Sequence, residues 1–213
     1  MTNYSKHITP RFNQDVLVQV KIDPLMEQII DFDESKGVFS WYGSFELIWT
    51  DDLITWNVSE NGGITSIHVP FTDVWVPKLI IANSATKRTF YQFDNDFDYH
   101  TSKVSFDSDG TGYLLAGGII DTSCDADIVY YPADYHICQM ELHPETNEIE
   151  LLKPKPNMYE IAMKYYEGDP EWDVTNITSD LFIEEATLLW CLIFISKESL
   201  CISLKVSSCL LFL

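Results

Sequence analysis

The chain has 213 residues, of which 46% are hydrophobic and 14% aromatic. This length suffices for one sizeable domain or two small ones, and so many large apolar side chains exclude a disordered chain. The formal net charge of −20 at pH 7 argues against a nucleic-acid partner, whose phosphates it would repel, and favours cationic ligands, unless the acidic residues only keep the surface soluble.

The first two predicted elements are β-strands with apolar residues at every second position. Residues 15–23 read DVLVQVKID and place four β-branched side chains on one face: Val16, Val18, Val20 and Ile22. Residues 37–49 read GVFSWYGSFELIW and place five large apolar side chains on one face: Phe39, Trp41, Phe45, Leu47 and Trp49. A period of two is typical of strands with one buried face.

Four short stretches are predicted to be turns. They are residues 34–37 (ESKG), 61–63 (NGG), 107–110 (DSDG) and 117–118 (GG), and each carries the glycine or small polar residues that turns require. Short alternating segments with turns between them predict an all-β chain folded as a β-sandwich, rather than a parallel sheet with crossover helices.

Residues 92–110, QFDNDFDYHTSKVSFDSDG, form an acidic stretch. Its simplest interpretation is a solvated hairpin. Clustered carboxylates also bind calcium, but the stretch lacks the spacing of a calcium-binding helix–loop–helix.

Residues 124–138, CDADIVYYPADYHIC, place two cysteines with thirteen residues between them around a Tyr-Pro-x-Asp core. In a sandwich, a bond between these cysteines would stabilise the fold by about 3 kcal/mol, because it closes a loop of about 15 residues in the unfolded chain. The Tyr131-Pro132 pair predicts a turn, and Asp134 is placed to accept backbone hydrogen bonds within it.

The tail from residue 186 onward is strongly apolar, yet Lys197, Glu198 and Lys205 interrupt it before a membrane-spanning length of about 20 residues accumulates. The remaining three of the five cysteines lie there: Cys191, Cys201 and Cys209. At the other end, the first residues hold no apolar run of signal-peptide length, so the chain as written shows no route to secretion.

The stretch from Cys124 to Cys138 resembles the signature loop of the Cys-loop receptors, the pentameric neurotransmitter-gated ion channels that include the nicotinic acetylcholine receptors. The departure within it is Ala126, where the family usually has a larger apolar residue. Further likenesses follow in family order between Tyr4 and Thr178: Trp49, Asp51 and Trp56, then Val69, Pro70, Trp75, Pro77 and Asn83, then Glu171, Trp172 and Asp173. Lys78 replaces the family's usual Asp.

The resemblance implies an immunoglobulin-like β-sandwich, the extracellular ligand-binding domain of these channels, over residues 1–195. It also implies a disulfide between Cys124 and Cys138. By the same resemblance, we expect the family's N-terminal helix and signal peptide to be missing from residues 1–213. Residues 196–213 are expected to form an irregular apolar tail or the start of the first membrane helix.

The same resemblance implies homologous subunits in a pentamer as partners, together with a small neurotransmitter-like ligand and a membrane region beyond this sequence. The expected location is the extracellular side of the cell membrane. The alternatives are a secreted module of the acetylcholine-binding-protein kind and a truncated subunit that binds nothing. Both for a channel subunit and for a secreted module, we expect Trp49, Trp56 and Trp75 in the core. Pro70 and Pro77 are expected at strand ends.

The family's ligand cage is built from aromatic residues, and three of its positions hold other residue types here: Ser44, Ala82 and Glu145. The adjacent cysteine pair of acetylcholine-binding subunits is also absent. Because each cation–aromatic contact contributes up to about 2 kcal/mol, no acetylcholine site is expected. Two interpretations stay open: Glu145 pairs with an amine near Tyr42 and Glu46, or the positions bind nothing.

Three sequons begin at Asn3, Asn57 and Asn176, and the latter two are candidate glycosylation sites of an extracellular protein. The five histidines lie at positions 7, 68, 100, 136 and 143 without metal-ligand spacing, and no nucleophile or phosphate-binding motif is present. We therefore expect no enzyme, no metal and no cofactor, and a structural role for His136.

Overall fold

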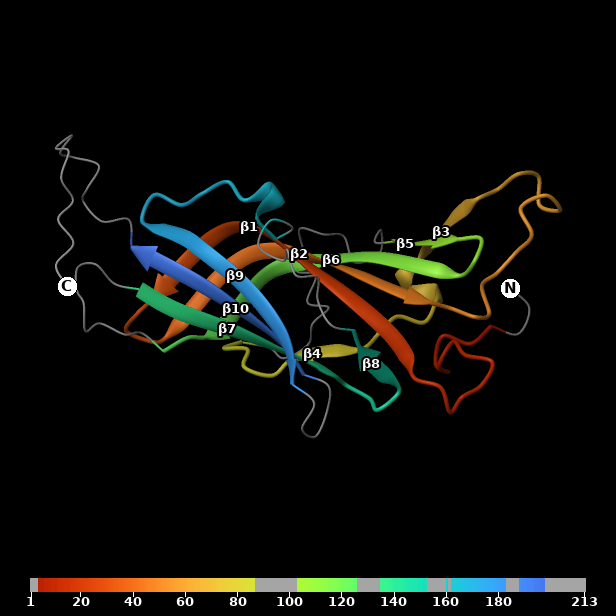
Figure 1. Cartoon of the computed structure of the whole chain (residues 1–213), viewed down its shortest axis with the longest axis horizontal. Coiled ribbons are helices and arrows are strands. Elements are labelled where there is room, and N and C mark those ends of the chain that lie inside the picture. Colours follow the sequence, from red (N-terminus) through yellow and green to blue (C-terminus); the bar gives the residue numbers. More distant parts are fainter. Residues whose placement is uncertain are drawn as a thin grey trace.

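The computed structural model describes residues 4–86, 103–125, 135–152, 160, 162–182 and 188–197. Within them the chain is built of strands, in agreement with the predicted all-β class (Figure 1). The strands are β1 (Val18–Asp33), β2 (Val38–Thr50), β3 (Ser66–Pro70), β4 (Leu79–Ile81), β5 (Lys103–Asp107), β6 (Thr111–Ser123), β7 (Tyr135–Pro144), β8 (Ile149–Leu151), β9 (Trp172–Phe182) and β10 (Leu188–Lys197). Two short 3₁₀ turns, η1 (Phe71–Asp73) and η2 (Met163–Tyr165), interrupt them.

These strands form the two sheets of a sandwich. The first has six strands in the order β3-β5-β6-β2-β1-β8, and the second has four in the order β4-β7-β10-β9. Neighbouring strands are antiparallel, except that β1 and β8 pair in parallel. The predicted β-sandwich is therefore confirmed.

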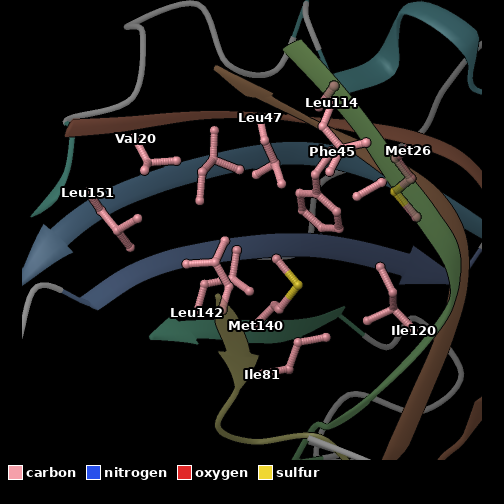
Figure 2. Packing of buried hydrophobic residues seen from close by; sticks show 14 of the residues in the cluster. Val20, Met26, Phe45, Leu47, Ile81, Leu114, Ile120, Met140, Leu142 and Leu151 are labelled. Atoms are coloured by element: carbon pink, nitrogen blue, oxygen red, sulfur yellow. The ribbon is translucent and has the colours of Figure 1, made fainter. Parts of the chain in front are cut away.

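The core lies between the inner faces of the two sheets. Figure 2 shows Val20, Phe45 and Leu47 of the six-stranded sheet facing Met140 and Leu142 of the other. Each such side chain contributes about 2 kcal/mol when it leaves water completely. The alternating faces predicted for β1 and β2 are the buried ones.

One residue of the first predicted strand is an exception. Val16 precedes β1 and is 49% exposed, whereas Val18, Val20 and Ile22 are buried. The predicted strand begins too early, because Val16 ends a turn in which its N–H bonds to the carbonyl of Asn13.

Three of the four predicted turns are confirmed, at residues 34–37, 61–63 and 107–110. The turn predicted at Gly117 and Gly118 is wrong, because both residues lie inside β6 opposite Ser44 and Gly43. A Cβ atom on Gly117 would lie 2.6 Å from the Gly43 carbonyl oxygen. Glycine is needed here for the close approach of two strands and not for a reversal of the chain.

The acidic stretch is only partly described, since residues 87–102 lie outside the described residues. Its last part forms the predicted hairpin of β5 and β6. Among the described residues, no group of three or more His, Cys, Asp or Glu side chains is placed to hold a metal ion. Within the same residues, no helix is long and apolar enough to cross a membrane.

Candidate functional site at the disulfide end

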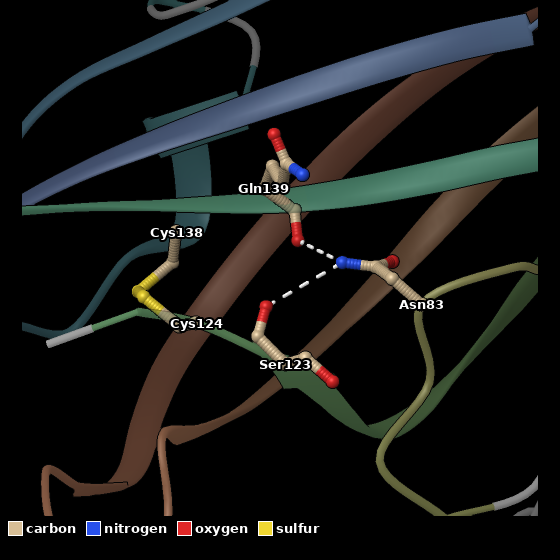
Figure 3. The surroundings of a disulfide bond; sticks show 5 residues. All are labelled: Asn83, Ser123, Cys124, Cys138 and Gln139. Atoms are coloured by element: carbon tan, nitrogen blue, oxygen red, sulfur yellow. Dashed lines mark hydrogen bonds between the residues drawn. A yellow bond between two sulfur atoms is a disulfide. The ribbon is translucent and has the colours of Figure 1, made fainter.

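The predicted disulfide between Cys124 and Cys138 is present and joins the two sheets (Figure 3). Cys124 directly follows β6 of the six-stranded sheet, whereas Cys138 lies in β7 of the four-stranded sheet. Their Cα atoms are 4.8 Å apart, and both residues are buried. The bond is therefore a covalent link across the sandwich, while the loop tip at residues 126–134, with Tyr131, Pro132 and Asp134, lies outside the described residues.

Asn83 makes a second link between the sheets beside the disulfide, as Figure 3 shows. Its Nδ2 donates hydrogen bonds to the carbonyl oxygens of Gln139, at 2.8 Å, and Ser123, at 3.5 Å. Its Oδ1 accepts one from the N–H of Glu141 at 3.0 Å. Ser123 belongs to β6 and the other two to β7, so one amide group contacts both sheets.

The turn between β1 and β2 contacts the disulfide directly. The carbonyl oxygen of Gly37 accepts a hydrogen bond from the N–H of Cys124 at 2.9 Å. Gly37 has φ 65°, a conformation that glycine adopts without strain. The carboxylate of Asp33 holds the turn by accepting from the N–H of Lys36 at 3.0 Å and from the Ser35 hydroxyl at 2.6 Å.

The same carboxylate forms an ion pair with Lys36, at 2.5 Å between Nζ and Oδ2. Hydrogen bonding to the Lys36 side chain, followed by that to Ser35, holds the pKa of Asp33 well below its usual range. Asp33 is therefore ionised at neutral pH and can hold both partners.

The end of β10 lies beside these segments. Ser196 pairs with Tyr135 at the start of β7, and Ile193 pairs with Cys138. We call the β1–β2 turn, the disulfide and the last residues of β10 the disulfide end of the domain. Three chain segments that are far apart in sequence meet there.

His136 packs under this end as a buried ring. Its ring centroid is 4.9 Å from that of Phe32 and 5.4 Å from that of Trp172, both in edge-to-face arrangements. Phe32 and Trp172 also contact each other, at 5.3 Å. This aromatic cluster connects β1, β7 and β9, which is the structural role predicted for His136.

The three predicted cage positions do not come together within one chain. Ser44 lies in β2 of the six-stranded sheet, whereas Ala82 and Glu145 lie at opposite ends of the β4–β7 ladder in the four-stranded sheet. Ser44 is only 5% exposed, and its hydroxyl lies 3.4 Å from Oε1 of Glu27 on the neighbouring strand. The three positions therefore lie on separate elements, and the Ser44 side chain is closed off from solvent.

Ala82 and Glu145 are positioned by main-chain bonds. The N–H of Ala82 donates to the carbonyl of Glu141, and the N–H of Glu145 donates to the carbonyl of Lys78, both at 2.8 Å. The Glu145 side chain is exposed. The hairpin tip between β9 and β10, residues 183–187, lies outside the described residues.

A polar cluster at the opposite end of the domain was not predicted from the sequence. Asp51 is fully buried and accepts hydrogen bonds from the Tyr4 hydroxyl, at 2.7 Å, and from the N–H groups of Leu53 and Ile54. The Tyr4 hydroxyl in turn accepts one from the N–H of Trp75 at 3.0 Å. We call this the Asp51 end.

Burial raises the pKa of both partners at the Asp51 end, because each charged form loses water. The sequence pattern singles out Asp51 only as the acidic residue two positions after Trp49 and does not indicate its burial. Trp49 and Trp75 pack there as predicted, with ring centroids 6.2 Å apart. Trp56 is only partly buried and donates from Nε1 to the carbonyl of Ile64, so its predicted place in the core is corrected to the rim.

Comparisons with known proteins agree with this geometry. The chain matches the family model of the neurotransmitter-gated ion-channel ligand binding domain over residues 1–192. It is 26% identical over 176 residues to the human neuronal acetylcholine receptor subunit alpha-2. The aligned segment covers 82% of this chain and 32% of that protein.

Two further relatives come from invertebrates. The neuronal acetylcholine receptor subunit eat-2 of Caenorhabditis briggsae is 26% identical over 177 residues, covering 81% of this chain and 35% of that protein. The acetylcholine receptor subunit alpha-like 2 of Drosophila melanogaster is 27% identical over 191 residues, covering 84% and 32%. The chain thus spans about a third of the length of these curated relatives.

Proposed function

The chain belongs to the neurotransmitter-gated ion-channel ligand-binding domain family, and we propose that it is the extracellular ligand-binding domain of one subunit of a pentameric ligand-gated ion channel. In this proposal it assembles with homologous subunits, and ligand binding at their boundaries is transmitted to a pore in the membrane. A secreted binding protein of the same fold is the alternative that the experiments below must separate.

The observation that carries the proposal is the convergence of three segments at the disulfide end. Strand β10 ends beside the start of β7, because Ser196 pairs with Tyr135. The β1–β2 turn contacts Cys124 at the same end. A movement of β9 and β10 would therefore reach the turn and the disulfide loop together, which is the mechanical requirement for coupling ligand to pore.

The cage positions limit the class of ligand. Ser44 and Ala82 offer no aromatic face, and each missing face removes up to about 2 kcal/mol from the binding of a desolvated cation. A quaternary amine that depends on such faces is therefore disfavoured. Glu145 is the exposed carboxylate among the three positions, and an amine bearing N–H groups would pair with it through a charge-assisted hydrogen bond.

The channel assignment is tested by the coding sequence beyond Leu213. The proposal expects four apolar segments of about 20 residues each, the length needed to cross a bilayer as a helix. A stop codon directly after Leu213 would instead support the secreted binding protein. The full-length protein, purified in detergent, is expected to have the mass of five subunits, and a strictly monomeric product would contradict the proposal.

The role of Glu145 is tested by calorimetric titration of the assembled protein with a series of primary and quaternary amines. Glu145→Gln is expected to weaken the binding of primary amines at least tenfold, which corresponds to about 1.4 kcal/mol. Glu148→Gln is the matched control, because Glu148 is exposed on the same turn and carries the same charge. Equal affinities for all three proteins, or no binding at all, would reject the amine site.

A further inference from the structure

The loop between β2 and β3 holds the sequon Asn57-Val58-Ser59 in a defined conformation. The N–H of Ser59 donates a hydrogen bond to Oδ1 of Asn57 at 3.0 Å, which makes a turn closed by the asparagine side chain. Asn57 and Ser59 are both exposed. The acceptor amide and the hydroxyl of the sequon are thus presented together to solvent.

The loop does not need the amide nitrogen of Asn57. Its shape is held by the main chain: the Asn57 carbonyl accepts from the N–H groups of Glu60 and Asn61, each at 3.2 Å, and the Val58 carbonyl accepts from Gly63 at 2.9 Å. Within the described part of the chain, Nδ2 of Asn57 donates no hydrogen bond. A substituent on that nitrogen would therefore leave the loop intact.

The second described sequon is built differently. Asn176 lies inside β9, paired with Phe194 of β10, and Thr178 is paired with Leu192. The backbone is extended there, so the asparagine side chain cannot close a turn on the residue two positions later. Both Asn57 and Asn176 are exposed. They differ in local backbone conformation, because Asn57 lies in a turn and Asn176 in a strand.

The position of Asn57 is compatible with the proposed function. Figure 1 shows the β2–β3 loop at the end of the domain where the N-terminal segment lies, whereas β7 begins and β10 ends at the opposite end. A bulky group on Asn57 would therefore lie far from the disulfide end and would leave the coupling segments free.

We propose that Asn57 carries an N-linked glycan. The donor is an oligosaccharide on a lipid diphosphate: the bond between its first sugar carbon and the diphosphate oxygen breaks, and a bond from that carbon to Nδ2 of Asn57 forms. The lipid diphosphate leaves with the bonding electron pair, and one Nδ2 proton passes to a base of the transferring enzyme. The inference rests on the extracellular location in the proposed function.

The test is expression of the chain behind a cleavable secretion leader in insect or mammalian cells. Glycans are released enzymatically in ¹⁸O-labelled water, which converts a glycosylated Asn to labelled Asp, and the peptides are analysed by mass spectrometry. Label at position 57 is expected in the wild type, in Ser59→Thr and in Asn176→Gln. It is expected to fall to background in Asn57→Gln and in Ser59→Ala, which keeps the N–H that closes the turn.

An unlabelled position 57 in wild-type protein would overturn the inference, whatever happens at Asn176. Glycan transfer occurs on the translocated chain, so protein retained in the cell is analysed in the same way and should carry the same label. The leader forces translocation, so a missing glycan at Asn57 counts against this inference alone. Failure to assemble five subunits counts against the proposed function alone.

Discussion

The two ends of the domain hold distant segments together by different chemistry. At the disulfide end, a covalent bond and the Asn83 amide cross from one sheet to the other. At the Asp51 end, a buried carboxyl group gathers the Tyr4 hydroxyl and the turn at Leu53 and Ile54. Within the residues described there, that end holds no covalent cross-link.

This difference predicts which condition weakens each end. The disulfide end depends on redox state, because reduction removes its covalent bond. The Asp51 end depends on pH, because burial raises the pKa of Asp51. Reduction should therefore weaken the disulfide end alone, and a loss of stability as the pH rises above about 4 should come from the Asp51 end. Each substitution below changes one end only.

The largest effect is expected at the disulfide. The double variant Cys124→Ser, Cys138→Ser should lose about 3 kcal/mol of unfolding free energy, because its unfolded chain is no longer constrained by a loop of about 15 residues. The measurement is urea unfolding with and without reductant. Reductant should destabilise the wild type and leave the variant unchanged; an equal response of both proteins would show that this bond does not stabilise the fold.

A smaller loss is expected at Asn83. Asn83→Ala should cost about 2 kcal/mol, because the Gln139 carbonyl and the Glu141 N–H lose a partly buried partner. Urea unfolding measures the loss of unfolding free energy. Faster hydrogen exchange of the Glu141 amide would show that the loss arises at this cross-sheet contact. Asn83→Asp retains the acceptor and loses the donor, so it should fall between Ala and wild type. An unchanged exchange rate in Asn83→Ala would contradict the cross-sheet role.

At the opposite end, Tyr4→Phe should cost about 1.5 kcal/mol, since it removes one hydrogen bond to Asp51 and one from the Trp75 N–H. Thermal or urea unfolding measures the loss. Tyr165→Phe is the control, because Tyr165 is 54% exposed and its substitution should change little. Equal stability of both variants would show that the N-terminal segment is not fastened by Tyr4.

The smallest effect concerns pH. Because folding raises the pKa of Asp51, the stabilising contribution of this group is complete below its unfolded pKa of about 3.9 and is lost as the pH rises through its folded pKa. Asp51→Asn should lack this loss, so wild-type stability should fall relative to the variant as the pH rises from about 4. Glu60→Gln should follow the wild type, since Glu60 is exposed and lies outside this cluster. The measurement is the unfolding free energy of all three proteins as a function of pH. Parallel curves would contradict the claim that folding raises the pKa of Asp51.

Much of the sandwich is predictable from the sequence, because long stretches of its strands keep a period of two where one face is buried. The positions of Phe39, Trp41 and Leu47 follow from that pattern alone. The prediction at Gly117 is wrong because glycine serves both turns and close strand contacts, and only the pairing of β6 with β2 distinguishes them. Local sequence cannot show which strand lies opposite.

The site is less predictable for the same reason. The family pattern predicts the bond between Cys124 and Cys138 correctly, and it marks Asn83 without giving its role. The buried Ser44 has its hydrogen-bond partner, Glu27, on the adjacent strand, and the buried Asp51 has one in Tyr4, 47 positions away. Contacts of this range arise from the packing of the whole domain.

The central claim is that the link between Cys124 and Cys138 joins the two sheets of this domain. Mass spectrometry of a proteolytic digest of the folded protein, made without reductant, tests it most directly. We predict one cross-linked peptide pair containing positions 124 and 138. Free thiols at both positions, or a bond from either one to Cys191, Cys201 or Cys209, would contradict this claim.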